Sequence, residues 1–410
     1  MKNKISLFIG LVLCWNGTTG QALADLLVLV NEANLETKIL EKDYQIALEK
    51  IPQVGQRPDP EIGLGIYPLP VETRLGAQWT RLSATQMLPW FGVLDSQKDL
   101  AQAQANTLLP KVKIKQLDKQ FLVKQAYYQL YELEQTQAIL QENIVLYNSL
   151  ENLALAKVET GTASAADVLK IQLKKKALEQ KIRLLESNEQ YPSIQINQIL
   201  DRGLDTSIDV MEQLQFTELD FDKDTLLQHI KQQHPQMNVY DLQQESARQA
   251  MALNKLKAKP SLGVGVDYIY VRKRSDAEPT SNGRDIVQLR GSIKVPLNKD
   301  QYDAKEREEQ LRITRIEEQK RHTSQQFLVA IEQAYTDAEI ARLNMELYQE
   351  QIEITKGAIQ ILESDYSASG KGFDELLEHH QALVNYEVQI VQAIVQSHLA
   401  KAKIERYIKP

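Results

Sequence analysis

The chain has little of the chemistry on which most enzymes and nucleic-acid binders depend. It has one cysteine, Cys14, in 410 residues, and its 48 Lys+Arg against 55 Asp+Glu give a formal net charge of -7. A single thiol forms no intrachain disulfide and no thiolate metal cluster. An acidic chain also lacks the positive charge that neutralises phosphates, so we expect no nucleic-acid partner.

Catalytic signatures are missing as well. The sequence has no Gly-x-Ser-x-Gly elbow, no Gly-x-x-x-x-Gly-Lys phosphate loop and no His-Glu-x-x-His pair. His379 and His380 are adjacent, and neighbouring residues on a helix point in different directions, so they form a poor metal pair. We therefore expect no enzymatic activity, no catalytic residue, no cofactor and no metal site.

The N-terminus has the pattern of an export signal. Two lysines precede an apolar run at residues 5–15, and Ala22-Leu23-Ala24 follows as a cleavage site. The run is shorter than the roughly 20 residues that a spanning helix needs, and no later segment is apolar enough. We predict a cleaved signal peptide at residues 1–24. Lipid attachment at Cys14 is disfavoured, because Leu13 stands where such sites have a small residue.

The remaining chain repeats itself. Pro60-Glu61-Ile62-Gly63-Leu64-Gly65 recurs as Pro260-Ser261-Leu262-Gly263-Val264-Gly265, and Phe121-Leu122-Val123 recurs as Phe327-Leu328-Val329. Each half reads as an amphipathic helix, two strands, a very long helix, a glycine-bearing turn and another helix. We predict repeats at 25–187 and 222–410, a connector at 188–221, strands at 61–67, 74–88, 261–272 and 286–296, and helical turns at 159–166 and 367–374.

The predicted strands alternate between polar and apolar residues, which gives each strand one face of each kind. This pattern fits a half-buried soluble sheet, and it also fits a membrane barrel with polar side chains toward a lumen. Four strands are too few to close a barrel, since about eight is the minimum, so a barrel needs several chains; three would supply twelve strands. The predicted lumen-facing residues are Arg74, Gln78, Gln288, Arg290 and Lys294.

The long helices are the third feature. Between Asp300 and Tyr366 there is no proline and only Gly357, and apolar residues recur near every 3.5 positions, as in a coiled coil. At 1.5 Å per residue such a helix is about 100 Å long, too long for one compact globule. Residues 93–158 repeat the arrangement, and we predict that Pro110 kinks this helix without ending it.

These residues together resemble the outer membrane efflux protein family, whose namesake is TolC. The resemblance covers the whole mature chain. It rests on the duplicated order of elements and on four segments: Met87-Leu88-Pro89-Trp90-Phe91-Gly92, Lys294-Val295-Pro296-Leu297, and the turns from Gly161 to Leu169 and from Gly370 to Leu377. The stretch Pro70-Val71-Glu72-Thr73-Arg74 further resembles the branch linked to heavy-metal cation efflux.

The resemblance implies a mainly α fold with a small β part. It implies a homotrimer with a twelve-stranded barrel in the outer-membrane lipid of a Gram-negative bacterium, and antiparallel coiled-coil hairpins that extend through the periplasm. The implied partners are a periplasmic adaptor (membrane fusion) protein and an inner-membrane pump of the resistance-nodulation-division type. The implied function is that of a passive exit channel in a tripartite efflux system, where the pump selects the substrate.

The turns supply the candidate site residues. Asp167, Glu375 and Glu378 follow them and are candidates for a cation-attracting pore entrance, although acidic residues also stabilise helix N-termini. The second turn has Glu-Leu-Leu-Glu where many family members have Asp-Val-Leu-Asp, which puts the family's gating geometry in doubt. The candidates for adaptor docking are Gly161, Thr162, Ser164, Gly370, Lys371 and Gly372.

Two alternatives remain open at the level of sequence. One is the outer-membrane channel of a one-step protein secretion system, which uses the same architecture. The other is a secreted coiled-coil structural protein whose strands form a small soluble sheet.

Overall fold

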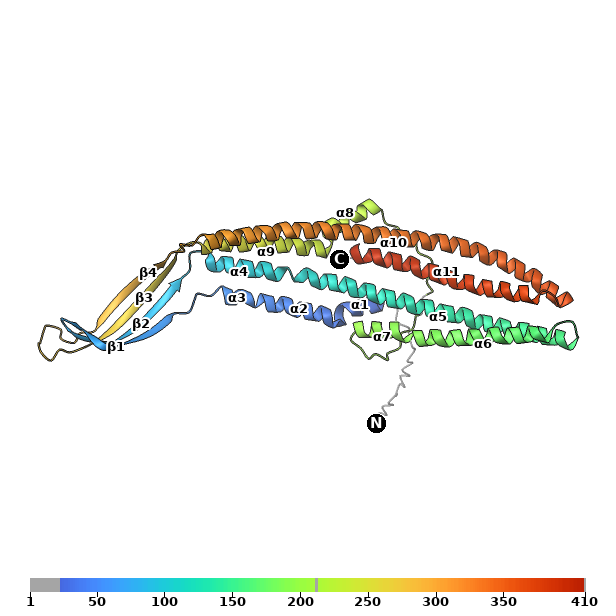
Figure 1. Ribbon diagram of the computed structural model, residues 1–410, viewed down its shortest axis with the longest axis horizontal. Helices are drawn as coiled ribbons and strands as arrows, with labels where there is room; N and C mark the ends of the chain where they lie inside the picture. The colour runs from blue at the N-terminus through green and yellow to red at the C-terminus, as the bar shows by residue number, and fades with distance from the viewer. Residues whose placement is uncertain (1–22, 211–212, 409–410) are drawn as a thin grey trace, which may run out of the picture. The chain divides into compact units, whose positions relative to one another are not determined.

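The computed structural model describes residues 23–210 and 213–408, so residues 1–22 of the predicted signal peptide, Cys14 included, lie outside the described residues. Long helices and one four-stranded antiparallel sheet make up the fold (Figure 1), which confirms the predicted fold class for the chain. Within the described ranges, every helix is too short or too polar to cross a lipid bilayer.

Both halves of the chain consist of helices, then two strands, then further helices that include a long one, although the number of helices differs between them. The first half contains α1 (Leu23–Ala33), α2 (Leu35–Leu48), α3 (Lys50–Val54), β1 (Glu61–Thr73), β2 (Gly76–Leu88), α4 (Val93–Asn106), α5 (Leu109–Glu159), α6 (Ala165–Asn188) and α7 (Gln190–Ile199). The second contains α8 (Lys223–Gln233), α9 (Pro235–Lys257), β3 (Ser261–Arg272), β4 (Ile286–Lys294), α10 (Asp300–Ser369) and α11 (Phe373–Ile408).

The helix before the first turn is interrupted, so the prediction of a mere kink at Pro110 was wrong. Helix α4 ends at Asn106, and α5 begins at Leu109. Between them, the Leu108 N–H donates to the Ala105 carbonyl at 2.9 Å in a tight turn. Proline has no N–H to donate, and this loss costs least in the first turn of a helix. Pro110, the second residue of α5, lies in that turn.

The first strand is longer than the sequence suggested. It continues past residue 67 to Thr73, and it is irregular between Ile66 and Val71, where its register with β2 shifts. Strand β2 then begins at Gly76, two residues later than predicted. Consequently Arg74 lies in the hairpin turn and not on a strand.

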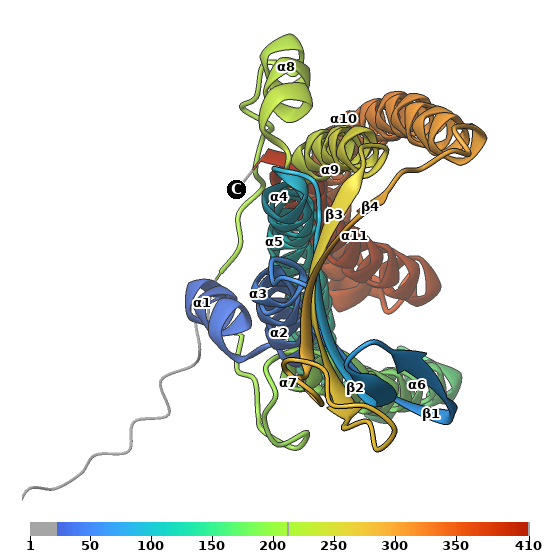
Figure 2. The same cartoon turned by 90° about the vertical axis from the view of Figure 1, so that its left-hand side faces the viewer.

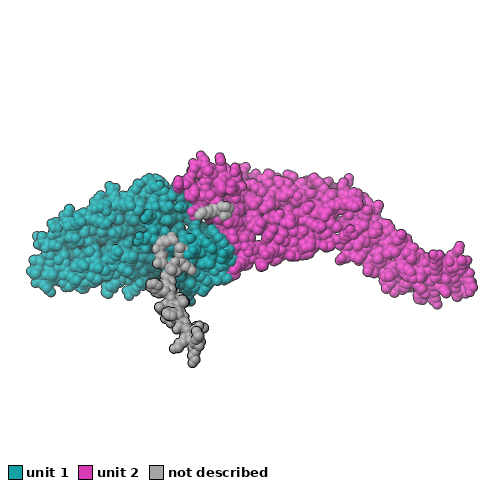
Figure 3. Space-filling model, turned by 180° about the vertical axis from the view of Figure 1, so that it is seen from behind, with its two compact units in different colours: residues 1–34, 119–219, 334–403 teal, residues 35–118, 220–333, 404–410 magenta. Residues whose placement is uncertain are grey.

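The chain divides into two compact units, coloured separately in Figure 3. Unit 1 comprises residues 1–34, 119–219 and 334–403, and unit 2 comprises residues 35–118, 220–333 and 404–410. Helices α5, α10 and α11 contribute residues to both.

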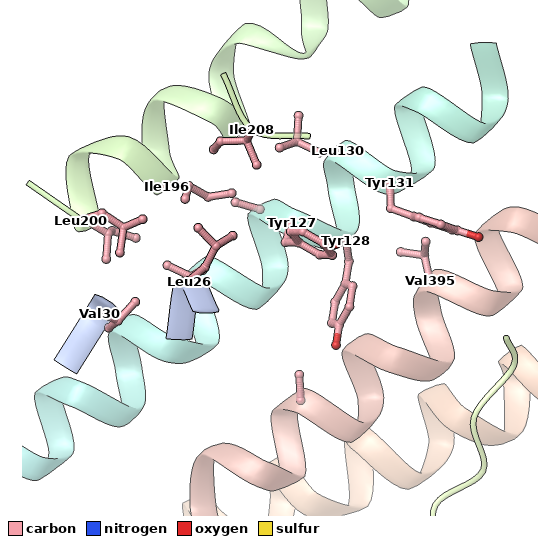
Figure 4. Close-up of a cluster of buried hydrophobic side chains, with 14 of the residues drawn as sticks. Leu26, Val30, Tyr127, Tyr128, Leu130, Tyr131, Ile196, Leu200, Ile208 and Val395 are labelled. Carbon is pink, nitrogen blue, oxygen red and sulfur yellow. The ribbon is translucent and has the colours of Figure 1, made fainter. Parts of the chain in front are cut away.

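Unit 1 has a core in which α1 and α7 pack against α5 and α11. Leu26 of α1, Tyr127 of α5 and Ile196 of α7 are fully buried there, and Figure 4 shows their side chains converging. The buried Asn34 side chain donates to the Ile199 carbonyl at 2.9 Å, which fixes the chain after α1 against the end of α7. Burial of these apolar groups is what holds the connector helix in place.

Unit 2 contains the sheet and the helices next to it. His234, between α8 and α9, lies in a buried cluster of aromatic side chains in this unit. Its ring lies 4.6 Å from that of Phe327 and 5.9 Å from that of Tyr407, centroid to centroid. The His234 Nδ1 accepts from the Gln236 N–H at 3.1 Å and so caps α9. Burial lowers the pKa of His234 to about 4, with Asp118 opposing this shift and Arg406 adding to it.

This buried imidazole predicts a pH-dependent stability. The unfolded chain protonates His234 near its ordinary pKa of 6.5, whereas the folded chain does so only near 4. The free energy of unfolding should therefore fall by on the order of 3 kcal/mol as the pH drops through this window. His234→Asn keeps a capping side chain and should lose that part of the slope. Denaturant unfolding between pH 4 and 7 measures both; identical slopes would contradict the assignment.

Candidate functional site

The sheet has two faces of opposite chemistry, which its register assigns. Its strands are antiparallel in the order β1-β2-β3-β4, and directly paired residues share a face. Asp267 on β3 pairs with Ser83 on β2 and with Gln288 on β4. The face that contains these residues, called the polar face below, carries Gln78, Arg81, Ser83, Thr85, Asp267, Gln288, Arg290, Ser292 and Lys294. The same register also places Val71, Ile269, Val271 and Ile286 on this face, beside the turn between β1 and β2 and the loop between β3 and β4.

Glycines bring polar side chains close to the strands on this face. A Cβ at Gly263 would lie 2.4 Å from the Ser292 Oγ and 2.8 Å from the Met87 Sδ, so both neighbouring side chains occupy the space that glycine leaves. A Cβ at Gly63 would lie 2.8 Å from the Ser83 Oγ in the same way. The repeated Gly-x-Gly of the two halves therefore makes room for the polar face.

The opposite face, called the apolar face, is hydrophobic and open. Leu289 is 84% exposed and Ile62 is 75% exposed. A monomeric soluble protein rarely exposes so continuous an apolar surface. Such a surface is typical of a site that contacts lipid or another protein chain. Its exposed members are Ile62, Leu64, Ile66, Leu82, Leu262, Val264, Val266, Tyr268, Tyr270, Val287, Leu289 and Ile293.

A buried carboxylate links three strands on the polar face. Asp267 has no exposed surface, forms an ion pair with Arg81 on β2, and lies 3.7 Å from the Arg290 guanidinium on β4. The Arg290 Nη2 also donates to the Thr85 Oγ1 at 2.7 Å. The arginines thus compensate a charge that would be unstable alone. Sequence reasoning missed Asp267 and Arg81, although an acidic residue among alternating hydrophobes was a visible signal.

The five residues predicted to face a lumen separate into two groups. Gln78, Gln288, Arg290 and Lys294 lie on the polar face. Arg74 does not, because it belongs to the turn between β1 and β2. A shift of register between Gln78 and Thr80 also turns Thr80 toward the apolar face, opposite Tyr270.

The two helical turns depend on glycine. Gly161 has φ +72°, and Gly370 and Gly372 have φ +70° and +82°, values that side chains disfavour. After Gly161, the Thr162 N–H donates to the Lys157 carbonyl at 2.9 Å, which ends α5. The Ser164 hydroxyl then accepts from the Ala166 N–H and starts α6.

The two turns pack against each other, which sequence reasoning had not predicted. A Cβ at Gly370 would lie 2.1 Å from the Thr162 carbonyl oxygen, so the second turn presses directly on the first. The Lys157 ammonium donates to the Ser367 carbonyl at 2.6 Å, and Lys170 pairs with Asp374. The Asp374 carboxylate raises the pKa of Lys170. Beneath the turns, a shared core contains Ile171, Tyr366, Phe373 and Leu376.

The three acidic candidates differ in exposure. Asp167 is only 9% exposed, lies 3.9 Å from the Lys170 ammonium, and occupies the first turn of α6. Its carboxylate adds to the burial that raises the pKa of Tyr366. This placement matches the helix N-terminus reading. Glu375 and Glu378 are exposed, so they are the carboxylates available to an entrance.

Most of the docking candidates are accessible. Gly161, Thr162, Ser164, Lys371 and Gly372 are exposed, and Gly370 is half-buried under the first turn. Sequence reasoning missed Leu169 and Leu173, which are 61% and 72% exposed one helical turn apart on α6. They line a cavity of about 580 Å³ with Glu151, Gln172, Lys175, Lys176 and Glu179. Apolar residues at this spacing, outside the buried seam, were the available signal.

The second of the two adjacent histidines is buried beside a carboxylate. His380 is 3% exposed and lies 3.4 Å from the Glu363 carboxylate; burial lowers the pKa of His380, and Glu363 opposes that shift. Across residues 23–210 and 213–408, no three His, Cys, Asp or Glu side chains are grouped to hold a metal ion.

Comparison with known proteins identifies the fold. No family model matches the chain, and no curated protein matches it. The outer-membrane channel OprN matches with a TM-score of 0.74 at 15% identity, over 94% of this chain and 89% of that one. CusC matches with 0.76 at 12% identity, over 94% and 91%. The outer membrane protein VceC of Vibrio cholerae matches with 0.71 at 13% identity, over 94% and 95%. The chain shares their fold.

The contact between the turns predicts unequal effects of two similar substitutions. Gly161→Ala and Gly370→Ala both place a side chain at positive φ, which costs about 1–2 kcal/mol. Only Gly370→Ala also drives a Cβ into the Thr162 carbonyl, because nothing lies within 4 Å of that position at Gly161. Gly370→Ala should therefore lower the denaturation midpoint more and speed proteolysis at both turns. Equal losses in the two variants would show that the turns do not press together.

Proposed function

We propose that three copies of this chain assemble into the outer-membrane exit channel of a tripartite efflux system. The channel conducts substrates passively, and an inner-membrane pump supplies the energy, so the chain itself needs no catalytic centre. Its helical hairpins extend through the periplasm toward a periplasmic adaptor.

The observation that carries this proposal is the sheet. Its exposed apolar face suits lipid, and its opposite face is polar and charged, which is the division that a water-filled barrel requires. In the described part of the chain, β1 and β4 each have a strand on one side only. Open edges are not tolerated in hydrocarbon, so β4 of one copy must pair with β1 of the next until the sheet closes.

The shared fold supports the rest of the proposal. The matching proteins are described as outer-membrane channels, among them OprN and the MtrE channel of Neisseria gonorrhoeae in its open state. By analogy, the packed helical turns with exposed Thr162, Lys371 and Glu375 form the adaptor-facing end. Heavy-metal cations are one substrate hypothesis, which rests only on the resemblance of residues 70–74, followed by the strand exit at residues 88–92, to the heavy-metal branch.

Substitution on the two faces tests the barrel. Leu289→Asp places a charge on the lipid-facing side and should sharply reduce heat-modifiable trimers in the outer-membrane fraction. Ser292→Asp lies on the same strand but on the polar face, and it should assemble as well as the wild type. It is a better control than a change at Gln288, which lies opposite the buried Asp267. Equal trimer yields in both variants would overturn the orientation.

The function is tested by deletion. A strain without this protein should become sensitive to substrates of the pump, measured as growth on copper, silver, zinc, cobalt and cadmium salts beside dyes, bile salts and antibiotics. Sensitivity to metals alone would support cation efflux, and sensitivity to organic compounds would support drug export. Unchanged growth, with a secreted protein missing from the medium, would point instead to a one-step secretion channel.

A further inference from the structure

A cavity of about 410 Å³ lies where the sheet meets the helices of unit 2. It is lined by residues at the same end of three strands: Met87 near the end of β2, Ser261 at the start of β3 and Lys294 at the end of β4. Met87, Ser261 and Lys294 all belong to the polar face by register. The cavity therefore opens toward the side that the proposed function assigns to the lumen, and not toward lipid.

The charge around this cavity is positive. Lys257, Lys259 and Lys294 line it and are exposed, and its lining contains no acidic residue. Lys259 also lines a neighbouring cavity that contains Asp303 and Glu306, whose carboxylates offset its charge. Lys257 and Lys294 are therefore the lysines available to bind an anion in the first cavity. Glu306 itself pairs with Lys255, at 3.1 Å. Further along the same face, Arg81 and Arg290 share the single carboxylate of Asp267, which leaves an excess of positive charge.

Helix ends contribute on both sides. Val93, the first residue of α4, and Tyr302, in the first turn of α10, line the cavity. Helix N-termini favour anions, but Asp95 in the first turn of α4 and Asp300 and Asp303 in that of α10 offset this effect, so the lysines supply the positive charge of the cavity. The C-terminal end of α9 has the opposite polarity, and Lys257 in its last turn offsets this.

The rest of the wall is apolar. Trp90, Met87, Val93 and Leu256 present hydrophobic surface, and three prolines restrict the chain around them: Pro58, Pro89 and Pro296. A volume of about 410 Å³ lies in the range of small-molecule sites. A small inorganic anion would leave this apolar wall unused, and a cation would be repelled.

We propose that this cavity binds an amphipathic organic anion, with a carboxylate or sulfonate between Lys257 and Lys294 and a hydrophobic body against Trp90 and Leu256. The inference rests on the proposed function, because it names the substrate class that passes through the channel. A permissive channel needs a weak site that releases its cargo. At this cavity, amphipathic anions are favoured over metal cations.

Binding is measured by the fluorescence of Trp90. The sequence has tryptophans at 15, 79 and 90, and Trp15 falls in the predicted signal peptide, so Trp79→Phe leaves Trp90 as the only reporter in the mature protein. In this background, deoxycholate should change the fluorescence saturably, whereas the cation dodecyltrimethylammonium should not. Lys257→Gln with Lys294→Gln should weaken deoxycholate binding about tenfold per lost charged contact. Lys231→Gln, at an exposed lysine on α8, is the matched control and should bind as the parent does.

Each contrary result has a distinct meaning. Equal responses to both amphiphiles, or an unchanged double variant, would overturn the proposal. Loss of a co-purifying phospholipid from the double variant would assign the cavity to membrane lipid instead and would likewise overturn it. Conductance of trimers in planar bilayers distinguishes failure of the proposed channel from failure of the proposed anion site. Absence of conductance would contradict the channel. Conductance that deoxycholate blocks less well in the double variant would support both the channel and the site.

Discussion

The whole structure depends on an unmet requirement of the sheet. A β-strand at the edge of a sheet carries unpaired N–H and C=O groups, and hydrocarbon offers them no partner. Among the described residues, the sheet has two such edges, on β1 and β4, and an exposed apolar face between them. In water the apolar face of the isolated sheet is exposed, and in lipid its two edges lack hydrogen-bond partners. In the proposed trimer, copies that share the sheet would meet this requirement.

Within the sheet, ion pairs between neighbouring strands help to fix the strand register. Glycine-rich strands are prone to slip in register, and a slip by one residue exchanges the two faces. Asp267 contacts arginines on the strands at both sides, so a slip would leave a buried carboxylate without a counter-charge. The glycines that create space for this cluster thus weaken the register, and the cluster itself restores it. This gives the repeated Gly-x-Gly a physical role in both halves.

Sequence reasoning predicted the fold class because the long helices and alternating strands are local, periodic signals. It placed Gln288, Arg290 and Lys294 on one face for the same reason. It failed where tertiary contacts or a single residue decide the local structure: at the break before Pro110 and at the turn that contains Arg74. Asp167 was a candidate both for a pore entrance and for stabilising a helix N-terminus, and packing buries it beside Lys170, which the sequence pattern did not indicate. The Asp267 cluster and the cavity at Lys257 join residues from distant segments, which no local pattern reveals.

The contact of Gly370 with Thr162 has a mechanical consequence. Two hairpins that only lay side by side could slide along each other, but here the second turn rests on the backbone of the first, and Lys157 fastens it to Ser367. A force applied to one turn is therefore transmitted to four helices. A protein that binds either turn would therefore move both hairpins of this chain together.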